Sequence, residues 1–309
     1  MSRVVDDKSE HCIPFILERL RLHRKKYADD QHAPPFFLGL NGLQGAGKTT
    51  LVSTLSHTLR SPPRSLPTTV LSIDDLYLPY LLQQHLATSH PTNPLVQHRG
   101  QPSTHDIALG RSVFSSLRNG QPTKIPSYDK SAFTGQGDRV PEEKWECVNQ
   151  ENQEGQERVR VVIFEGWCVG FRPLSREEVK SKWEDAVRAK EQGGYRGRLG
   201  CNRLEDVEFI NAALREYDEL TDQFDALIHI DAEDTQYVYE WRLEQEAALR
   251  ATKGVGMTDE QVVNFVNGYY PAYELFTERL RAGAFGEEKG RQLRLVVGKD
   301  REVKEVFRV

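Results

Sequence analysis

The sequence predicts an α/β fold in which a mostly parallel β-sheet is covered by helices on both faces. Three observations lead to this prediction. Short, β-rich apolar runs alternate with amphipathic stretches along nearly the whole chain, a Gly-rich turn joins the first run to a helical stretch, and acidic residues directly follow two later runs. Ligands of such sheets bind at the carboxyl ends of the strands, so the functional residues are expected just after these runs.

The individual elements follow from local patterns. Buried strands are expected where short apolar runs are bounded by turn residues, over 36–40, 69–73, 159–164, 226–230 and 294–297. Helices are expected where apolar residues recur at helical spacing, over 13–27, 48–59, 104–119, 175–192, 204–220 and 235–250. A Thr258–Gln261 capping box opens one more helix, and polar residues 135–158 indicate an exposed hairpin or loop.

Length and charge limit the classes of protein that fit. The chain has 309 residues, so we expect one domain over 1–309 with a lid and acceptor-binding insertions. The net charge of −5 provides neither a basic surface for nucleic acid nor a polybasic membrane patch. The sequence contains no run of about 18 apolar residues, so no membrane span is predicted. We therefore expect a monomeric enzyme with a small-molecule substrate, although the sequence does not fix the oligomeric state.

The cysteines and the N-terminal segment bear on location. Four cysteines lie far apart with no Cys-x-x-Cys pair, which disfavours a zinc site or a disulfide framework and indicates a reducing compartment. Residues 1–10 have neither the apolar core of a secretory signal nor the composition of a transit peptide. The expected location is cytoplasmic.

The clearest functional signal is the stretch Gly42-Leu-Gln-Gly-Ala-Gly-Lys48-Thr49, which fits the phosphate-binding P-loop pattern G-x-x-x-x-G-K-[ST]. Its glycines let backbone N–H groups point at phosphate oxygens, and the following helix N-terminus adds partial positive charge. Lys48 is expected at the β- and γ-phosphates and the Thr49 hydroxyl at Mg²⁺. The predicted nucleotide-binding residues are Gly42, Leu43, Gln44, Gly45, Ala46, Gly47, Lys48, Thr49, Thr50 and Arg242.

Other motifs narrow the class of P-loop protein. The Asn-Lys-x-Asp motif of GTPases and the Leu-Ser-Gly-Gly-Gln signature of transport ATPases are both missing. Their absence favours a small-molecule kinase of the P-loop NTPase fold. Arg242, near the start of the helix that follows the fourth strand, is a candidate lid residue over the ATP phosphates, with a purely structural role as an equal alternative.

Acidic residues follow the second and third strands. Asp74 or Asp75 can accept the proton of an acceptor hydroxyl and help to hold Mg²⁺, although either can instead cap the next helix. Only one of the two adjacent side chains can point at the site, and Asp74 is favoured as the catalytic residue together with Lys48. Glu165 is a Walker-B-like acid for Mg²⁺, with a solvated strand-end position as its alternative.

Two polar segments between elements are candidates for acceptor binding. In the first, Arg99 can hold a carboxylate or phosphate with its planar fork, whereas Asp106 caps a helix. In the second, Tyr128, Lys130 and Arg139 supply donors suited to a small polyhydroxy acid. Taken singly, each residue is equally consistent with an ordinary surface position that has no function. Their clustering with Gly and Pro favours a binding role.

These motifs together resemble the phosphoribulokinase, uridine kinase and pantothenate kinase group, and their details are similar to the D-glycerate 3-kinases of plants and fungi. The resemblance covers about residues 13–300. It is carried by His98-Arg-Gly-Gln-Pro, Pro126-Ser-Tyr-Asp-Lys-Ser131, Gly135-Gln-Gly-Asp-Arg139, Glu165-Gly-Trp-Cys-Val-Gly-Phe171, Gly256-Met-Thr-Asp-Glu-Gln-Val262 and Tyr270-Pro-Ala-Tyr273.

The resemblance implies ATP as donor and D-glycerate as acceptor, giving 3-phosphoglycerate. It implies that Asp74 is the base, that Lys48 and Thr49 bind ATP and Mg²⁺, and that Glu165 is a metal-side acid. The family also has an Asn-to-Tyr spacing like Asn211 and Tyr217, for which packing is the favoured role. Plant members begin with a plastid transit segment, which residues 1–10 do not resemble, so we do not expect the plastid setting here.

Two alternatives remain open at this point. The first is a kinase of the same fold that acts on another small acceptor, such as a nucleoside or pantothenate. The second is a non-catalytic protein that uses bound ATP as a switch. The presence of both Asp74 and Glu165 argues against the second, because a protein that only binds ATP needs neither.

Overall fold

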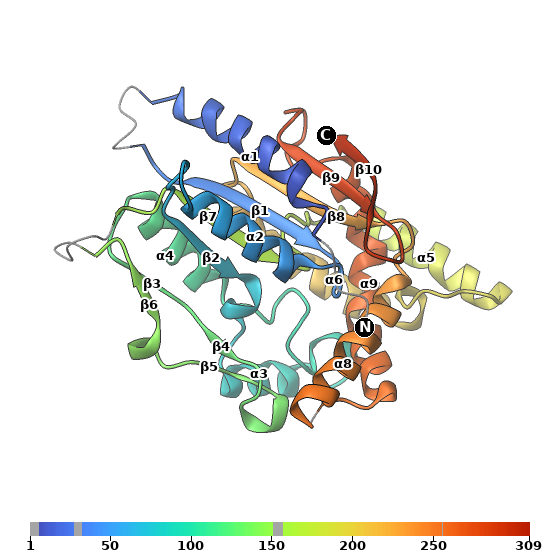
Figure 1. The fold of residues 1–309 in the computed structure, drawn as a ribbon. Helices are drawn as coiled ribbons and strands as arrows, with labels where there is room; N and C mark the ends of the chain where they lie inside the picture. Colours follow the sequence, from blue (N-terminus) through green and yellow to red (C-terminus); the bar gives the residue numbers. More distant parts are fainter. Residues whose placement is uncertain (1–5, 28–32, 151–156, 255) are drawn as a thin grey trace.

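The computed structural model of the chain describes residues 6–27, 33–150, 157–254 and 256–309. Its central element is a six-stranded sheet in the order β10-β9-β8-β1-β7-β2 (Figure 1). All neighbouring strands are parallel except β10, which runs antiparallel to β9. The strands are β1 (Phe36–Gly42), β2 (Thr68–Ser72), β7 (Val161–Gly166), β8 (Ala226–Ala232), β9 (Gln292–Val297) and β10 (Val303–Arg308).

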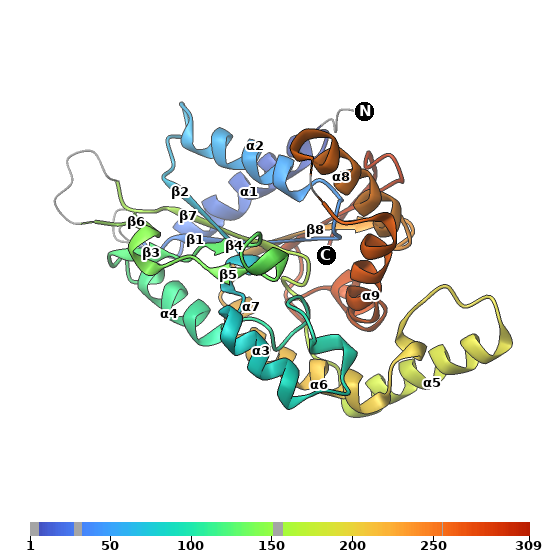
Figure 2. The same cartoon turned by 90° about the horizontal axis from the view of Figure 1, so that it is seen from below.

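Helices cover both faces of the sheet, as the sequence predicts. In Figure 2, α1 and α2 lie on one face, and α4, α6 and α7 lie on the other. The helices are α1 (Ser9–Arg24), α2 (Lys48–Arg60), α3 (Tyr80–Ser89), α4 (Ile107–Arg118), α5 (Arg176–Gln192), α6 (Leu204–Ala213), α7 (Asp218–Thr221), α8 (Tyr237–Lys253) and α9 (Asp259–Ala282). None of the helices in the described ranges is both long and apolar enough to cross a membrane.

Some elements differ from the sequence prediction. Helix α3 and strand β10 were not expected, since neither carries a clear apolar period. The single helix expected over 204–220 is divided into α6, a 3₁₀ turn and α7. The segment 135–158, expected as an exposed hairpin or loop, contributes two short strands that pair with strands earlier in the chain, although residues 151–156 lie outside the described part of the chain. These strands, β5 (Asp138–Arg139) and β6 (Glu146–Val148), pair with β4 (Tyr128–Asp129) and β3 (Thr123–Ile125) respectively.

Aromatic side chains join the sheet to the helices on one face. The ring of Phe114 on α4 lies 5.0 Å from that of Phe37 on β1 and 5.1 Å from that of Phe164 on β7. Gly39 on β1 leaves room for this packing, because a Cβ there would lie 2.7 Å from the side chains of both Leu227 and Phe224. Close packing of this kind fixes the register of the central strands, and with it the positions of the strand ends.

A buried carboxylate on β8 ties α9 to the sheet. Asp231 on β8 is fully buried and accepts hydrogen bonds from Arg281 on α9 at 2.7 Å and from Arg294 on β9 at 2.8 Å. Burial alone would raise the pKa of Asp231, but the hydrogen bond from Arg281 and the nearby positive charges hold it below its ordinary value. Removal of this charge would leave two guanidinium groups without their shared partner.

We predict that Asp231→Asn lowers the free energy of unfolding by about 3 kcal/mol or more, because loss of one partner from a buried ion pair is strongly destabilising. Urea denaturation at neutral pH measures the change. The matched control is Glu219→Gln, in a pair with Arg111 whose side chains are 52% and 49% exposed. It should cost less than about 1 kcal/mol. Equal effects for the two variants would contradict this role of Asp231.

Candidate active site

The phosphate-binding loop lies between the end of β1 and the start of α2. Gly45 and Gly47 adopt φ angles of 87° and 94°, in the left-handed region that favours glycine. The Lys48 ammonium folds back over the loop and donates hydrogen bonds to the carbonyl oxygens of Gly42 at 2.8 Å and Leu43 at 3.1 Å. Thr49 and Thr50 are exposed in the first turn of α2. The structure therefore presents the whole predicted loop at one helix N-terminus.

The electrostatic surroundings of Lys48 connect the loop to the neighbouring strand ends. Burial lowers the pKa of Lys48, and the carboxylates of Glu165 and Asp74 oppose this effect. Both acids act on Lys48 because β1, β7 and β2 are adjacent and parallel. In the pairing register, Leu40 lies opposite Glu165, and Glu165 lies opposite Ser72. This geometry brings the predicted residues Lys48, Glu165 and Asp74 to the same edge of the sheet.

The outer side of the loop is held by residues that sequence reasoning missed. Arg301 donates from Nε to the Gly45 carbonyl oxygen at 2.8 Å and from Nη2 to Glu244 on α8 at 2.6 Å. A Cβ at Gly45 would lie 2.5 Å from the Cβ of Trp241, so α8 packs directly on the loop. Arg301 is distant in sequence, and no local pattern singles it out.

The two adjacent acids after β2 have different environments. Asp75 accepts hydrogen bonds from the backbone N–H groups of Ser72 at 3.3 Å and Tyr128 at 3.1 Å, so it completes a capping box and attaches β4 to the end of β2. Burial raises the pKa of Asp75 to about 6. Asp74 instead forms a 2.5 Å ion pair with Lys130. Asp74 is therefore the acid directed toward Lys48 and Lys130.

Lys130 controls the charge state of Asp74. Burial by itself would raise the pKa of Asp74, but the Lys130 ammonium holds it below its ordinary value. Asp74 therefore remains a carboxylate at neutral pH and can accept a proton. The side chain of Asp74 is 27% exposed, so it remains accessible from solution.

Oxygen ligands suited to Mg²⁺ lie beside the loop. Glu165 is partly buried, and its carboxylate forms no hydrogen bond or ion pair with another described residue. Within the described ranges, no three His, Cys, Asp or Glu side chains are arranged to hold a metal by themselves. This donor set fits a Mg²⁺ ion that is bound through phosphates, waters and one or two protein oxygens, here from Thr49, Glu165 or Asp74.

Three of the residues predicted to bind the acceptor lie together beside Asp74. The Arg99 guanidinium carbon is 5.8 Å from the centre of the Tyr128 ring. Its Nη1 donates to the carbonyl oxygens of Gly135, at 2.8 Å, and Gln136, and Nη2 reaches the carbonyl oxygen of Lys130 at 3.5 Å. The Nη atoms of Arg99 thus hold the loop that carries Lys130.

Arg139 has partners within the protein that sequence reasoning did not identify. It donates to Asp106 at 3.0 Å and to the Tyr77 carbonyl oxygen at 3.0 Å. Asp106 also accepts the Leu109 N–H at 2.9 Å and so caps α4, which is the structural role considered for it. The contacts of Arg139 fix β5 against α4. They favour positioning of the acceptor segment over direct contact with an acceptor.

The predicted lid residue Arg242 lies close to the loop. Its charge acts on Lys48, and its guanidinium carbon is 5.1 Å from the centre of the Phe265 ring. It donates to Gln245 at 2.9 Å and Glu246 at 3.4 Å on the same helix. Its buried Nε has no hydrogen-bond partner among the described residues. Arg242 therefore retains a donor next to the phosphate-binding loop.

Aromatic residues surround Asp74 in a group that we call the aromatic cluster, and apart from Tyr128 its members were not predicted as site residues from the sequence. Tyr77 is at its centre: its ring stacks on His105 at 4.5 Å, and its hydroxyl lies 3.5 Å from that of Tyr269. Trp167 joins the cluster with its ring 4.9 Å from that of Tyr269. The members are Tyr77, His105, Tyr128, Trp167, Tyr269 and Tyr273. Tyr77, Trp167 and Tyr273 lie in or beside the motifs quoted in the sequence analysis. In sequence, however, an aromatic residue of a site cannot be distinguished from an aromatic residue of the core.

Four buried polar atoms of the aromatic cluster have no hydrogen-bond partner in the described part of the chain. They are His105 Nε2, Tyr128 Oη, Trp167 Nε1 and Tyr273 Oη. Buried polar atoms are usually paired, and each unpaired one costs on the order of 1–3 kcal/mol. Atoms of this kind are candidates for contact with a bound ligand.

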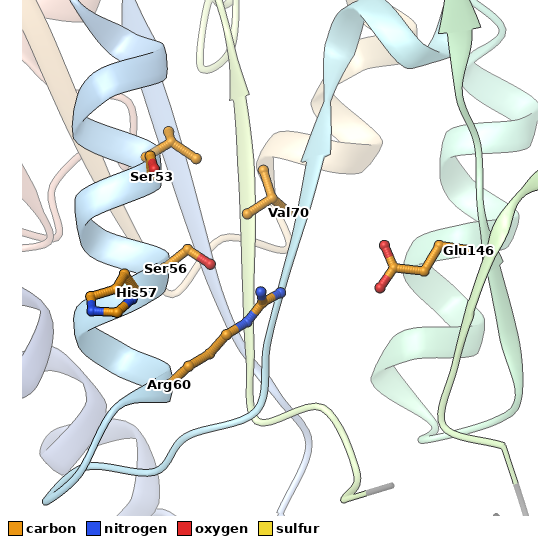
Figure 3. Close-up of a pocket in the computed structure, with 7 residues that line it drawn as sticks. Ser53, Ser56, His57, Arg60, Val70 and Glu146 are labelled. Atoms are coloured by element: carbon orange, nitrogen blue, oxygen red, sulfur yellow. The ribbon is translucent and has the colours of Figure 1, made fainter.

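A separate pocket of about 420 Å³ lies between α2, β2 and β6. Figure 3 shows Ser53, Ser56, His57, Arg60, Val70 and Glu146 around it. Arg60 is the last residue of α2 and donates to the Thr68 carbonyl oxygen at 2.9 Å, at the start of β2. The pocket therefore extends toward the amino ends of the strands and includes none of the predicted site residues.

Comparisons with known proteins give relatives over nearly the full chain, although no family model matches it. "Uncharacterized kinase mug58" of Schizosaccharomyces pombe is 38% identical over 260 residues, which are 81% of this chain and 85% of that protein. The chloroplastic D-glycerate 3-kinase of Arabidopsis thaliana is 33% identical over 92% of this chain, and the match spans 57% of that longer protein.

A solved structure agrees with the sequence comparisons. D-glycerate 3-kinase from Cryptococcus neoformans has a TM-score of 0.87 and 34% identity, with 99% of this chain and 100% of that chain covered. Each of these three proteins is named as a kinase. This chain therefore shares the fold of that solved structure over the sheet and its covering helices.

We predict that Gly45→Ala weakens ADP binding roughly tenfold or more, because a strained left-handed residue costs about 1–3 kcal/mol and its methyl group would meet Trp241. Isothermal titration with ADP measures this change. Gly268→Ala is the matched control, since an added Cβ there meets nothing within 4 Å. Equal ADP affinity in the two variants would contradict the importance of this packing.

Proposed function

The chain belongs to the D-glycerate 3-kinase family, and from this premise we propose that it transfers the γ-phosphoryl group of ATP to the 3-hydroxyl of D-glycerate, giving 3-phosphoglycerate and ADP. The observation that supports this most is the position of Asp74. It is a partly exposed carboxylate that pairs with Lys130, acts on Lys48, and is adjacent to the aromatic cluster.

In this proposal Asp74 accepts the proton of the acceptor hydroxyl. The oxygen of that hydroxyl forms a bond to the γ-phosphorus while the bond from this phosphorus to the bridging oxygen breaks, and the electron pair remains on ADP. Positioning and electrostatic stabilisation supply most of the rate in such reactions. Lys48, which donates to Gly42 and Leu43 here, would donate to the β- and γ-phosphates instead.

The phosphates and their metal are assigned to the residues around the loop. The backbone N–H groups of residues 42–50 would bind the phosphate oxygens, with Arg242 donating from the side of α8. Thr49, Glu165 and Asp74 would hold Mg²⁺, which neutralises negative charge on the phosphates. Glu165 suits this role because its carboxylate has no competing ion pair among the described residues.

The acceptor is assigned to the other side of Asp74. Lys130 and Arg99 bring positive charge to a place where a small anion can approach the base, and charged donors of this kind bind carboxylates strongly. Tyr128 contributes a buried hydroxyl that has no partner among the described residues. Arg139 would position this segment through Asp106 and Tyr77.

The organisation and location of the protein extend this proposal. We assign residues 1–309 to one kinase domain that acts as a monomer, with the segments around α3–β6 and α8 as acceptor-binding and lid insertions. All four cysteines are free, and burial raises the pKa of Cys12 and Cys168. Unreactive free thiols support a reducing compartment such as the cytoplasm.

We predict that Asp74→Asn lowers kcat for D-glycerate by about 100- to 10,000-fold, the usual contribution of a general base, while ADP affinity measured without Mg²⁺ stays within about threefold. Coupled ADP detection measures kcat. Asp75→Asn is the neighbouring control and should mainly lower stability. Turnover of Asp74→Asn near the wild-type rate would exclude Asp74 as the base.

The same assay tests the acceptor. Wild-type protein should release ADP with D-glycerate and not with uridine or pantothenate. Turnover of one of these and not of glycerate would replace the proposed acceptor. ATP binding with no stimulation by any acceptor would indicate the nucleotide switch.

We predict that Lys130→Met moves the acid limb of the kcat/KM profile to higher pH. The Lys130 charge lowers the pKa of Asp74, so its removal leaves burial to raise that pKa, and the carboxylate is lost at a higher pH. Steady-state rates between pH 4.5 and 8 test this, with the exposed Lys124→Met as control. If kcat/KM falls at every pH but its acid limb stays at the same pH, Lys130 does not set the pKa of Asp74.

A further inference from the structure

His105 is a buried member of the aromatic cluster to which the proposed function gives no role. It lies just before α4, its backbone bridges to Tyr77, and its side chain is 5% exposed. Its ring stacks on the Tyr77 ring with 4.5 Å between centroids and 20° between the planes. One face of the imidazole is thereby packed against Tyr77 within the cluster.

The hydrogen bonds of Tyr217 assign the tautomer of His105. The Tyr217 oxygen accepts the backbone N–H of Ser103 at 3.3 Å, and it lies 2.7 Å from His105 Nδ1. The hydroxyl proton of Tyr217 has Nδ1 as its acceptor in the described part of the chain, so Nδ1 is unprotonated. The proton of the neutral ring is therefore on Nε2.

The Nε2–H group points to a place without a protein partner. Nε2 is buried and forms no hydrogen bond with any described residue. Tyr77, on which the His105 ring stacks, forms a side-chain hydrogen bond with Asp74, so the imidazole and the base share this neighbour, and the Asp74 charge acts on His105. Burial also lowers the pKa of His105 to about 4, so the ring is uncharged at neutral pH. His105 thus presents one neutral donor next to the position assigned to the reacting hydroxyl.

Resting on the proposed function, we propose that His105 determines specificity by donating its Nε2–H to the hydroxyl of the acceptor that does not react, the 2-hydroxyl of D-glycerate. The three polar groups of the acceptor then have different partners. The reacting hydroxyl is at Asp74, and the carboxylate is near the cations Lys130 and Arg99. A single uncharged donor beside Asp74 matches the remaining hydroxyl, one carbon away.

Tyr217 is a positioning residue in this account, because it holds the tautomer and the orientation of the ring without reaching the acceptor. This differs from the packing role expected from its spacing with Asn211. Asn211 does have a structural role: it accepts the Leu174 N–H at 2.8 Å and donates to the Leu174 carbonyl oxygen at 3.0 Å. The same helical segment therefore carries one structural residue and one that acts through His105.

The test compares kcat/KM for D-glycerate with that for 3-hydroxypropanoate, which keeps the carboxylate and the reacting hydroxyl but lacks the 2-hydroxyl. Wild-type protein should prefer D-glycerate by at least about tenfold, since a site built to bond a hydroxyl rejects the analogue without it. His105→Asn keeps a polar group near Nδ1 but removes the Nε2 donor. It should lower kcat/KM for D-glycerate roughly 10- to 100-fold and that for 3-hydroxypropanoate less than about threefold.

Further variants separate this role from a structural one. His105→Gln returns an amide donor near the Nε2 position and should restore part of the preference. Tyr217→Phe should reduce the preference several-fold even if His105→Asn does not fold. His85→Asn, at an exposed position on α3, is the matched control and should leave the ratio unchanged.

Equal losses with both acceptors in His105→Asn, or an unchanged ratio in Tyr217→Phe, would overturn the assignment of His105. So would a wild-type protein that uses the two acceptors equally well. These outcomes are distinct from failure of the proposed function, which would appear as no phosphorylation of D-glycerate by the wild-type protein.

Discussion

Parallel pairing of β1 with β7, and of β7 with β2, is the constraint on which the rest of the site depends. It places Leu40, Glu165 and Ser72 opposite one another, so the residues that follow each strand meet at one edge of the sheet. Strand pairing thus brings together the phosphate-binding loop, Glu165 and Asp74. The local sequence of each of these segments does not by itself show that they are neighbours. Strand register, maintained by close packing at Gly39 and Phe114, thus carries over directly into the geometry of the site.

The cations of the candidate site have partners within the protein. Lys48 donates to two loop carbonyl oxygens, Lys130 pairs with Asp74, and Arg99 binds the carbonyl oxygens of its neighbouring loop. Under the proposed function, a phosphate or a carboxylate would replace the present partner of each of these cations. In contrast, Glu165 forms no ion pair with another described residue, and four buried polar atoms of the aromatic cluster have no hydrogen-bond partner among the described residues. The candidate site therefore combines cations that are paired within the protein with buried polar atoms that have no partner among the described residues.

The sequence was sufficient for five of the six strands of the sheet, most of the helices and the residues at the strand ends, because periodicity and the P-loop pattern are local properties. It did not show that Asp75 caps the turn while Asp74 faces Lys130, since both acids fit either role until the turn has a geometry. Arg301, Trp241 and the members of the aromatic cluster other than Tyr128 were missed for a related reason. Their importance comes from contacts between segments far apart in the chain, and an aromatic residue in the site has the same local signature as one in the core.

The central claim is that Asp74 exchanges its ion pair with Lys130 for the reacting hydroxyl of the acceptor. A crystal structure of the wild-type protein with ADP, Mg²⁺ and D-glycerate tests it most directly. The account predicts that the 3-hydroxyl of D-glycerate lies within hydrogen-bond distance of the Asp74 carboxylate and in line with the phosphate-binding loop. An acceptor bound elsewhere, with Asp74 still paired only to Lys130, would contradict it.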